Sequence, residues 1–440
     1  MSAGARPLRI AFVAYRGNMN CGGQGVYLWF LARELARLGH SVDVLVGPPY
    51  PDPMPFARSV ERLPNPQYWG GWFNRDRSKM LPRPIRRVFS PLNFYELAAS
   101  RMGFLPEPFA FSVRALRALS ARIRHGARYD LVHDVQCLGW GLLPLLRMGL
   151  TVVSTVHHPL SVDRRASFHR DKTLREALGT MEFYPVGMQA AVARRLDCIF
   201  TSSAVSARAL ERDFGVPTRK LRMVANGVDT ELFRPDPAAR RESDMILCVG
   251  RASDPNKGVR TLIEALALVP APARLTLVDD AHRDNPARGW AERAGVADRV
   301  HIAGRVDAAT LVSLYQRAAV VAVPSRYEGF GLPAVEGMAC ATPVIARAAG
   351  ALPEVVSTGG GGLLVDGTPE ALAKGLRTLL ADPELRARLG EQGRKGVTAA
   401  YAWPSVAART AGVYAELLEV RRGRPARTRT SAASGQRVAS

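Results

Sequence analysis

Hydrophobic residues in the first fifty positions fall into segments of two kinds. Residues 8–15 form a continuous apolar run, which is typical of a parallel strand buried on both faces. A glycine-rich loop at 16–25 follows, and residues 26–38 then place apolar side chains at helical spacing up to Gly39, a natural helix stop. The next apolar run, 41–46, completes a strand, helix, strand order. This order predicts a right-handed βαβ unit that opens a doubly wound parallel sheet.

The same alternation continues along the chain and restarts once. Further strands of the first half are expected at 130–133, 151–155, 197–201 and 221–224, and strands of the second half at 245–249, 275–278, 300–303, 320–323 and 343–346. A polar turn at Asn226–Asp229, followed by Pro235 and Pro237, separates the halves as a domain linker would. We therefore predict an α/β protein with two Rossmann-like doubly wound domains, 1–230 and 231–420, facing a central cleft. The second domain would include a terminal helix over about 405–420.

A segment rich in proline and arginine, at about 48–128, interrupts the pattern of the first domain and predicts an insertion. Within it, Phe111 to Ile123 has apolar residues at helical spacing with arginines beside them. This stripe has two interpretations: a basic amphipathic face that touches anionic lipid, or a helix with a core side and a solvated charged side. The last twenty residues, 421–440, lack periodicity and acidic residues, and are expected to be disordered.

Composition adds one unusual feature, a formal net charge of +21 carried mostly by arginine. Such charge attracts phosphates, anionic headgroups and nucleic acid, but no zinc-finger spacing, helix-turn-helix or aromatic-interleaved basic repeat is present, so no nucleic-acid partner is expected. The five cysteines are scattered and form no CxxC pair, which favours a reduced cytosolic compartment. The longest apolar stretch, 137–146, is far shorter than the about 20 residues that span a bilayer. The expected location is cytoplasmic, or peripheral on the inner face of the membrane.

The most specific pattern is the ten-residue segment from Tyr327 to Glu336, which follows the strand at 320–323. Glu328 to Gly331 would form a loop, and Leu332 would begin a helix whose backbone N–H groups suit a diphosphate. Glu328 and Glu336, eight positions apart, would flank this phosphate site, one reaching sugar hydroxyls and the other ribose hydroxyls. The alternative is that both are solvent-facing acids favoured by the helix dipole.

This pattern resembles the E-x7-E element of the GT-B glycosyltransferases of family GT4, and the resemblance extends over nearly the whole chain. Arg251 with Lys257 resembles the family's pair that grips the donor phosphates, although six positions separate them here where five are common. Gly22 and Gly23 resemble the family's first glycine loop, which would close over the phosphates. Ala349–Glu354 resembles its Gly-Gly-x-x-Glu turn, with Ala349 in place of one glycine.

The resemblance implies a donor site in the second domain. Its remaining members would be the strand-end pair Arg305 and Val306, which meets the nucleobase, and the loop residues Gly329, Phe330, Gly331 and Leu332. Glu328, Arg251 and Lys257 would act in catalysis, with the two cations stabilising the charge that develops on the departing diphosphate; a fixed contact of this kind is worth about 3–4 kcal/mol. No DxD or histidine-rich cluster indicates a metal, and no cofactor is expected.

Histidines follow two strands of the first domain and point to the acceptor side. His157 matches the histidine that related enzymes hold near the reacting sugar, and His158 and His133 could help to orient the acceptor. Two other interpretations stay open: structural histidines, or a metal site built from these three with Asp134. Some relatives carry a further histidine at the place of Val135, so a role that depends on it is absent or moved.

Together these features predict a retaining, metal-independent glycosyltransferase. It would move a sugar from a nucleotide-diphosphate sugar, a UDP- or GDP-sugar first, to a hydroxyl of a glycan, lipid-linked or small-molecule acceptor. The alternatives are a nucleotide-sugar epimerase on the same fold and a non-catalytic nucleotide-sugar-binding protein. Peripheral contact with an anionic membrane through the segment 48–128 is a further hypothesis.

Overall fold

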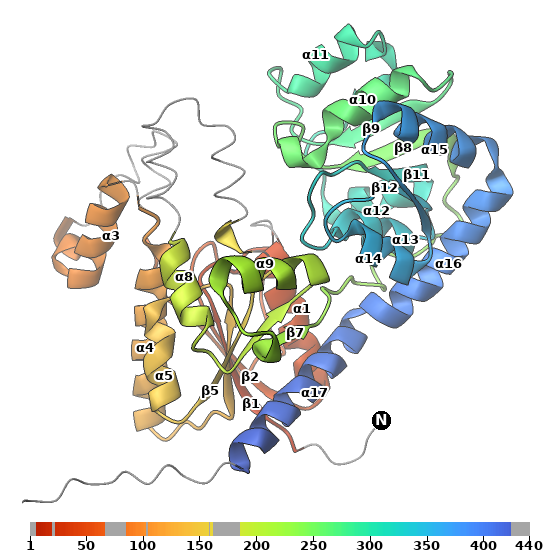
Figure 1. The fold of residues 1–440 in the computed structure, drawn as a ribbon. Helices are drawn as coiled ribbons and strands as arrows, with labels where there is room; N and C mark the ends of the chain where they lie inside the picture. The colour runs from red at the N-terminus through yellow and green to blue at the C-terminus, as the bar shows by residue number, and fades with distance from the viewer. Residues whose placement is uncertain are drawn as a thin grey trace, which may run out of the picture.

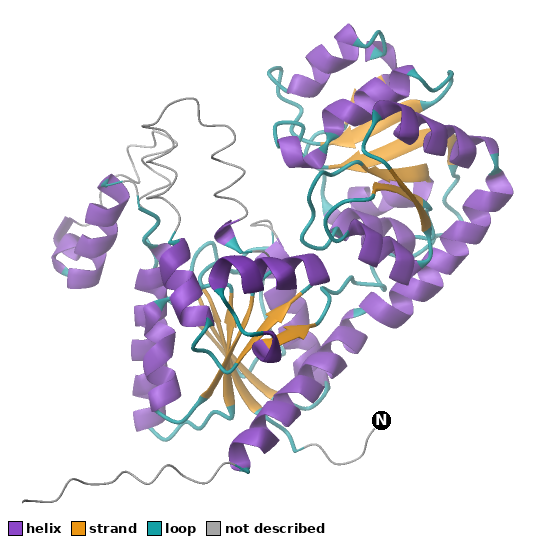
Figure 2. Ribbon diagram, viewed as in Figure 1, coloured by secondary structure: helices purple, strands orange, loops and turns teal. Residues whose placement is uncertain are grey.

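The computed structural model describes residues 6–19, 23–66, 85–102, 104–157, 159–161 and 185–423. The chain forms two α/β units, each built on a parallel sheet with helices packed against both faces (Figures 1 and 2). The first unit holds the amino-terminal half and the second holds most of the carboxy-terminal half. The predicted fold class is therefore confirmed.

The first sheet contains seven parallel strands in the order β3-β2-β1-β4-β5-β6-β7. Its strands are β1 (Arg9–Ala14), β2 (Ser41–Val46), β3 (Ser59–Arg62), β4 (Leu131–Val135), β5 (Thr151–Thr155), β6 (Cys198–Thr201) and β7 (Leu221–Met223). The central strand β1 lies between β2 and β4, so that Phe12 pairs with Val44 on one side and with His133 on the other. Its residues from Ile10 to Ala14 are fully buried, as the continuous apolar run predicts.

The second sheet contains six parallel strands in the order β10-β9-β8-β11-β12-β13. Its strands are β8 (Glu242–Val249), β9 (Arg274–Val278), β10 (Val300–Ile302), β11 (Ala318–Val323), β12 (Val344–Arg347) and β13 (Gly362–Val365). The connections from β8 and from β11 leave toward opposite sides of the sheet. That reversal opens a crevice at the carboxyl ends of these two strands, where ligands of doubly wound sheets bind.

Helices cover both faces of each sheet, and separate apolar clusters lie on the two sides of each. The helices of the first half are α1 (Gly23–Arg37), η2 (Ile85–Phe89), α3 (Pro91–Arg101), α4 (Glu107–Arg124), η3 (Trp140–Leu142), α5 (Leu143–Arg147), α8 (Val186–Ala193), α9 (Ala204–Phe214) and η4 (Thr218–Lys220). Those of the second half are η5 (Pro255–Lys257), α10 (Val259–Ala267), α11 (Pro286–Arg293), η6 (Ala297–Arg299), α12 (Ala308–Arg317), α13 (Leu332–Ala339), α14 (Leu352–Gly359), α15 (Pro369–Ala381), α16 (Pro383–Tyr401) and α17 (Trp403–Arg422).

The last helix, α17, returns to the first unit, whereas the sequence prediction assigned it to the second domain. Figure 1 shows α17 lying along the first unit. Trp403 and Tyr414 are buried in the same apolar cluster as strands β1 and β2, and the Trp403 ring stacks on Phe30 of α1 at 5.5 Å. Periodicity showed that this helix has an apolar side but not which sheet that side covers. The chain thus crosses between the units twice, and the crossings touch: the N–H of Val228 donates to the carbonyl of Tyr401 at 2.8 Å.

The segment 48–128 contributes a strand to the first sheet and a helix to its core. This corrects the prediction that the segment is an insertion. Strand β3 extends the sheet beside β2, and the helix α4 packs Phe111, Ala115 and Leu119 into the core with no exposed surface. The apolar stripe of α4 is therefore a core stripe, the second of its two interpretations. Residues 67–84 and 103 of this segment lie outside the described residues, as does the tail from residue 424.

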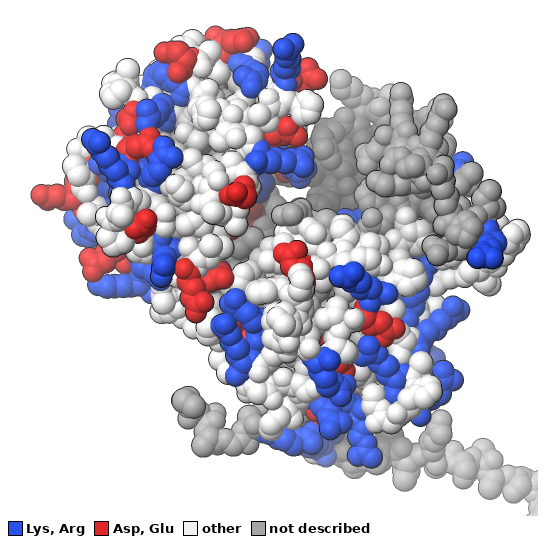
Figure 3. All heavy atoms as spheres, turned by 180° about the vertical axis from the view of Figure 1, so that it is seen from behind, with Lys and Arg blue, Asp and Glu red and all other residues white. Residues whose placement is uncertain are grey.

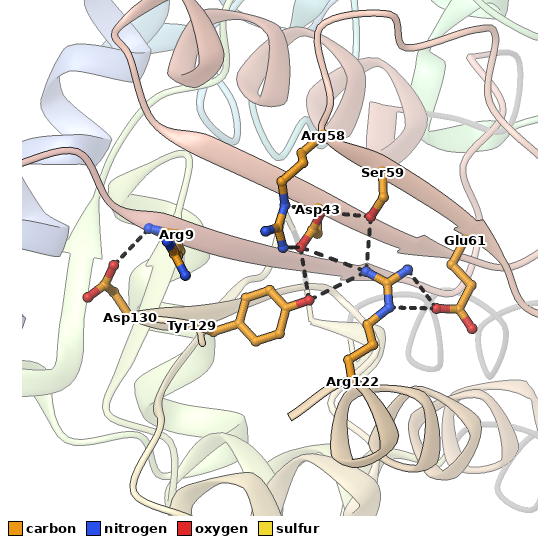
Figure 4. Close-up of polar contacts among 8 residues, drawn as sticks. All are labelled: Arg9, Asp43, Arg58, Ser59, Glu61, Arg122, Tyr129 and Asp130. Carbon is orange, nitrogen blue, oxygen red and sulfur yellow. Dashed lines mark hydrogen bonds and ion pairs between the residues drawn. The ribbon is translucent and has the colours of Figure 1, made fainter. Parts of the chain in front are cut away.

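Several arginines of this segment are held in internal ion pairs. Asp43 on β2 accepts hydrogen bonds from Arg58, Ser59 and Tyr129, and Arg122 of α4 reaches Glu61 on β3 at 2.9 Å (Figure 4). Burial alone would raise the pKa of Asp43, but these hydrogen bonds outweigh it and hold the pKa below its usual value. The cluster ties the edge strand and α4 to the sheet at the end remote from the second unit.

The basic side chains that remain at the surface are spread over both units. On the face shown in Figure 3, they gather over the lower unit and alternate with acidic residues over the upper one. No helix within the described ranges combines the length and the apolar character that a membrane span needs.

Candidate active site

The sequence motifs of the second half meet at the carboxyl ends of β8 and β11, in the crevice of the second sheet. Gly258, in the loop after β8, has φ +65° and lies against the carbonyl of Pro324, where an added Cβ would come within 2.2 Å. The N–H of Arg326 donates to the carbonyl of Asn256 at 2.7 Å. The two loops are therefore packed into one surface, as close backbone approach at Gly258 requires.

Two of the predicted catalytic residues contact each other on this surface. The Lys257 ammonium lies 2.8 Å from Oε1 of Glu328, and the Ser325 hydroxyl donates to the same oxygen at 2.8 Å. The side chains of Lys257 and Glu328 are 28% and 11% exposed, so the pair is partly buried. Arg251, two positions after the last residue of β8, is exposed. The loops after β8 and β11 thus carry two cations, Arg251 and Lys257, and one carboxylate, Glu328.

The loop Glu328–Gly331 and the helix after it form as predicted. Gly331 has φ +99° and precedes Leu332, the first residue of α13, while Phe330 is buried against Tyr401. A second loop supports Glu328 from behind, because Gly350 has φ +60° and an added Cβ there would lie 2.7 Å from the Glu328 backbone.

Ala349, which replaces a glycine of the family pattern, is not among the residues with positive φ. Its substitution therefore introduces no backbone strain.

Glu336, the second glutamate of the motif, lies on α13 and accepts a hydrogen bond from the Tyr315 hydroxyl at 2.7 Å. Burial raises its pKa to about 7, even though the Tyr315 hydrogen bond acts in the opposite direction. The carboxyl is therefore poised between its neutral and charged forms near neutral pH. An ionised carboxylate here can accept hydrogen bonds from hydroxyl groups, whereas the protonated form accepts them poorly.

The first unit contacts this surface directly. The hydroxyls of Ser202 and Ser203 donate to the carbonyl of Gly329, at 3.1 and 2.8 Å. A Cβ added at Gly23 would lie 4.0 Å from the Leu332 side chain, so the first glycine loop borders the start of α13. Gly22, its predicted partner, lies outside the described residues.

The predicted nucleobase residues lie at the edge of the second sheet. Gly304 has φ +80°, which suits its position as a turn after β10. Arg305 is 84% exposed at its side chain and forms a surface ion pair with Asp280, at 3.3 Å. Val306 is partly buried against the core cluster of α13.

His157 lies at the end of β5, where the first unit faces the second. Its backbone N–H donates to Oε1 of Gln136 at 3.1 Å, and its Nδ1 lies 3.2 Å from Oδ1 of Asn226, which makes Nδ1 the protonated nitrogen. The Tyr27 ring contacts it edge-on at 4.8 Å. These contacts fix the imidazole in position. His158 lies outside the described residues.

The sequence analysis did not identify Gln136 or the contacts that hold the loop in which it lies. Gln136 and Leu138 adopt positive φ without being glycine, and the buried Asp134 carboxylate accepts from the N–H groups of Cys137 and Leu138 at 3.1 and 3.0 Å. Burial raises the pKa of Asp134 to about 7. An acidic residue inside the fully buried strand β4 was the available signal, because a buried carboxylate needs several donors.

His133 does not face the acceptor side. It is fully buried between the rings of Phe12 and Phe200, its Nδ1 contacts the Tyr414 hydroxyl, and its Nε2 lies 2.7 Å from Oγ1 of Thr155. Burial lowers its pKa to about 3, so the ring is neutral. These surroundings correct the acceptor-side prediction and correspond to a structural histidine.

Among the described residues, no three His, Cys, Asp or Glu side chains gather in a way that could hold a metal ion. His133 and Asp134, two of the proposed metal ligands, have other partners. His133 contacts Tyr414 and Thr155, and Asp134 accepts a hydrogen bond from the backbone N–H of Cys137.

Comparison with known proteins follows the division into two units. The family model described as "Glycosyltransferase Family 4" matches residues 90–232, and the model "Glycosyl transferases group 1" matches residues 229–396. A protein of Mycolicibacterium hassiacum named MMP alpha-(1->4)-mannosyltransferase is 38% identical to this chain. The alignment covers 92% of this chain and 98% of that protein. A D-inositol 3-phosphate glycosyltransferase of Acidothermus cellulolyticus is 30% identical, in an alignment that covers 96% of this chain and 93% of that protein.

Solved structures agree in architecture. Sucrose-phosphate synthase from Thermosynechococcus elongatus superposes with a TM-score of 0.68 at 25% identity, covering 94% of this chain and all of that one. The Anabaena protein HepE, solved in complex with UDP-glucose, gives a TM-score of 0.65 at 19% identity, with 93% of this chain and all of that one covered. These likenesses extend over both units and confirm the predicted GT-B fold.

Proposed function

Because this chain belongs to glycosyltransferase family 4 and is a glycosyltransferase, we propose that its donor is a nucleotide-diphosphate sugar bound at the carboxyl ends of β8 and β11. The single observation that carries the proposal is the surface made by Arg251, Lys257 and Glu328 beside the start of α13. A UDP- or GDP-sugar is the donor to test first. The structure of HepE with UDP-glucose supports this class of donor.

Each part of a nucleotide sugar has a matching group at this site. The diphosphate suits the N-terminus of α13 together with the cations Arg251 and Lys257, because helix N–H groups and fixed positive charges both favour phosphate. Ionised Glu336 suits ribose hydroxyls, and Glu328 suits hydroxyls of the sugar. The serine contacts to Gly329 bring the first unit over the same loop.

The mechanism we propose is transfer with retention of configuration. The acceptor hydroxyl would attack from the face that the diphosphate leaves, and the departing phosphate would take the proton. Negative charge on the diphosphate grows during this step, and Arg251 and Lys257 would stabilise it without a metal ion. His157, fixed by Gln136 and Asn226, would contact the reacting sugar from the first unit.

The acceptor is proposed to be a hydroxyl of a glycan. The name of the Mycolicibacterium relative supports α-(1→4)-linked mannose oligomers as the first series of acceptors to test. D-inositol 3-phosphate, after which the Acidothermus relative is named, is the small acceptor to compare with them. Peripheral contact with an anionic membrane is an alternative use of the exposed side chains of η2 and α3, of which Phe89 is 83% exposed.

A calorimetric panel of UDP, GDP, ADP and dTDP tests the donor site on the full-length protein. One nucleotide should bind tightly, binding should be lost in Arg251→Ala and Glu336→Ala, and EDTA should leave it unchanged. Arg260→Ala is the matched control, because Arg260 is an exposed arginine of the neighbouring helix α10 that pairs with Glu264.

Absence of binding by all four nucleotides in a folded sample would overturn the donor site. Retention is tested separately, by the anomeric configuration of the product in NMR spectra.

A further inference from the structure

An apolar hollow of about 340 Å³ lies on the first unit, between α3, the start of α4, η3 and the start of α8. Four aromatic side chains dominate its lining: Tyr95, Phe104, Phe109 and Trp140. None of the described residues that line it is charged. A concave, mostly apolar hollow of this size lies at the lower end of the range for pockets that bind small ligands.

The hollow opens at the carboxyl-end edge of the first sheet, the edge that carries His157. Trp140 follows strand β4 by a few residues, and Met188 lies in the first turn of α8. Helix α4 leads back to the start of β4, so its first residues, with Phe109, lie at the carboxyl ends of the strands. The hollow therefore belongs to the side of the first unit on which an acceptor must bind.

Trp140 is 40% exposed, yet its backbone is rigidly supported. It stands between Gly139 and Gly141, and an added Cβ at either glycine would come within 2.2 Å of Ser112 in α4. The N–H of Gly141 donates to the Ser112 hydroxyl at 3.1 Å, and the rings of Tyr95 and Phe109 pack edge-on at 4.9 Å. A large aromatic ring that is exposed on a rigidly held backbone is suited to the recognition of a partner.

The same loop connects the hollow with the proposed reaction centre. Gln136, whose side chain holds the backbone of His157, precedes Trp140 by four positions. Four residues span at most about 14 Å, so the ring of Trp140 and the imidazole lie within the reach of a short oligosaccharide. Asp134 braces this loop through the N–H groups of Cys137 and Leu138.

We propose that the aromatic hollow binds the outer sugar units of an oligosaccharide acceptor, with one ring stacked on Trp140. This rests on the proposed function. A pyranose ring presents a face of C–H groups that packs on an aromatic ring, while its hydroxyls remain at the edge in water. A phosphate would find no cation among the described lining residues, which argues against a small phosphorylated acceptor in this position.

The membrane alternative would use different side chains. Phe89 and Phe94 are 83% and 61% exposed, and neither lines the hollow. A flat lipid surface contacts projecting residues such as these, whereas the hollow requires a ligand that enters it. Phe94→Ala is therefore a matched control for changes within the hollow.

The test measures binding of mannose and of α-(1→4)-linked mannose oligomers of two to six units to the full-length protein saturated with its nucleotide. The dissociation constant should fall at least fivefold between one and four units. Trp140→Ala and Phe104→Ala should abolish this length dependence without altering nucleotide binding, Trp140→Phe should retain most of it, and Phe94→Ala should retain all of it.

Equal affinity for all lengths, no binding of any oligomer, or an unchanged Trp140→Ala protein would overturn the proposal. So would loss of co-sedimentation with phosphatidylglycerol vesicles in Trp140→Ala, which would assign the hollow to membrane contact. Failure of the donor site gives a different result, because wild-type protein would then bind no nucleotide.

Discussion

Replacing Glu328 by Gln should change the affinities for nucleoside diphosphate and for nucleotide sugar in opposite directions. In the structure Glu328 holds the Lys257 ammonium at 2.8 Å, so a diphosphate must compete with this carboxylate for the same cation. Gln keeps the shape and a hydrogen-bond acceptor for Ser325 but removes the charge. The diphosphate should therefore bind more tightly to the variant.

The partial burial of the ion pair sets the size of the effect. Exposed pairs are worth up to about 1 kcal/mol, and breaking a fully buried pair costs about 3–5 kcal/mol. With side chains 28% and 11% exposed, this pair lies between these cases. About 1.4 kcal/mol, or about a tenfold lower dissociation constant for the nucleoside diphosphate, is the expected gain.

The nucleotide sugar should not share this gain. If Glu328 accepts hydrogen bonds from the sugar hydroxyls, losing a charged acceptor costs about 1.5–3 kcal/mol and offsets or exceeds the improvement at the phosphates. Titration calorimetry with the diphosphate and with a hydrolysis-resistant nucleotide-sugar analogue measures both. Glu264→Gln removes a pair with the same 2.8 Å separation on the exposed face of α10 and should change neither. Unchanged or weaker diphosphate binding in Glu328→Gln would refute the competition for Lys257.

Three further predictions concern buried groups. Since burial raises the pKa of Glu336 to about 7, nucleotide affinity should weaken as pH falls through 7 in wild-type protein, and calorimetry from pH 6 to pH 8 should find a flat profile in Glu336→Gln. Burial raises the pKa of Asp134 to about 7 in the folded protein, from an ordinary value of 3.8, so the folded state holds the proton more tightly. Ionising this group therefore lowers stability as pH rises from about 4 to 7, by up to about 4 kcal/mol. The stability of Asp134→Asn relative to wild type should therefore increase over that window in urea unfolding, and a constant difference would contradict the assignment. Tyr414→Phe should lower the free energy of unfolding by about 1–3 kcal/mol, because it leaves His133 short of a partner in the core, while nucleotide binding stays as in wild type.

The loop and helix at which we propose the donor site were predictable because their determinants are local. The loop from Glu328 to Gly331 and the helix from Leu332 follow one another in sequence, and glycine positions mark the turns. Strands such as β1 were predictable for the same reason, since burial on both faces produces an uninterrupted apolar run. The edge strand β3 was missed, because three of the four residues in its sequence Ser-Val-Glu-Arg are polar and none is buried.

The residues of the acceptor side were harder to predict from sequence, because their side chains contact residues that are distant along the chain. His133 and His157 both stand at or near strand ends in sequence, but Tyr414, 281 positions away, and Thr155 enclose the first of them. No local pattern distinguishes a histidine that faces a ligand from one that meets a tyrosine of a distant helix. The acidic Asp134 and the Gly139-Trp140-Gly141 sequence were visible signals, yet their meaning depends on α4 lying beneath them.

The double crossing of the chain makes the second unit, in topological terms, an insertion within the first. Two covalent connections leave the first unit at neighbouring points, near Val228 and Ala402, which form a β-bridge. A single tether would let the two bodies swivel in any direction. Two tethers side by side restrict them to rotation about one line through the crossings, so that the Ser203 contact with Gly329 and the Gly23 approach to Leu332 must open and close together.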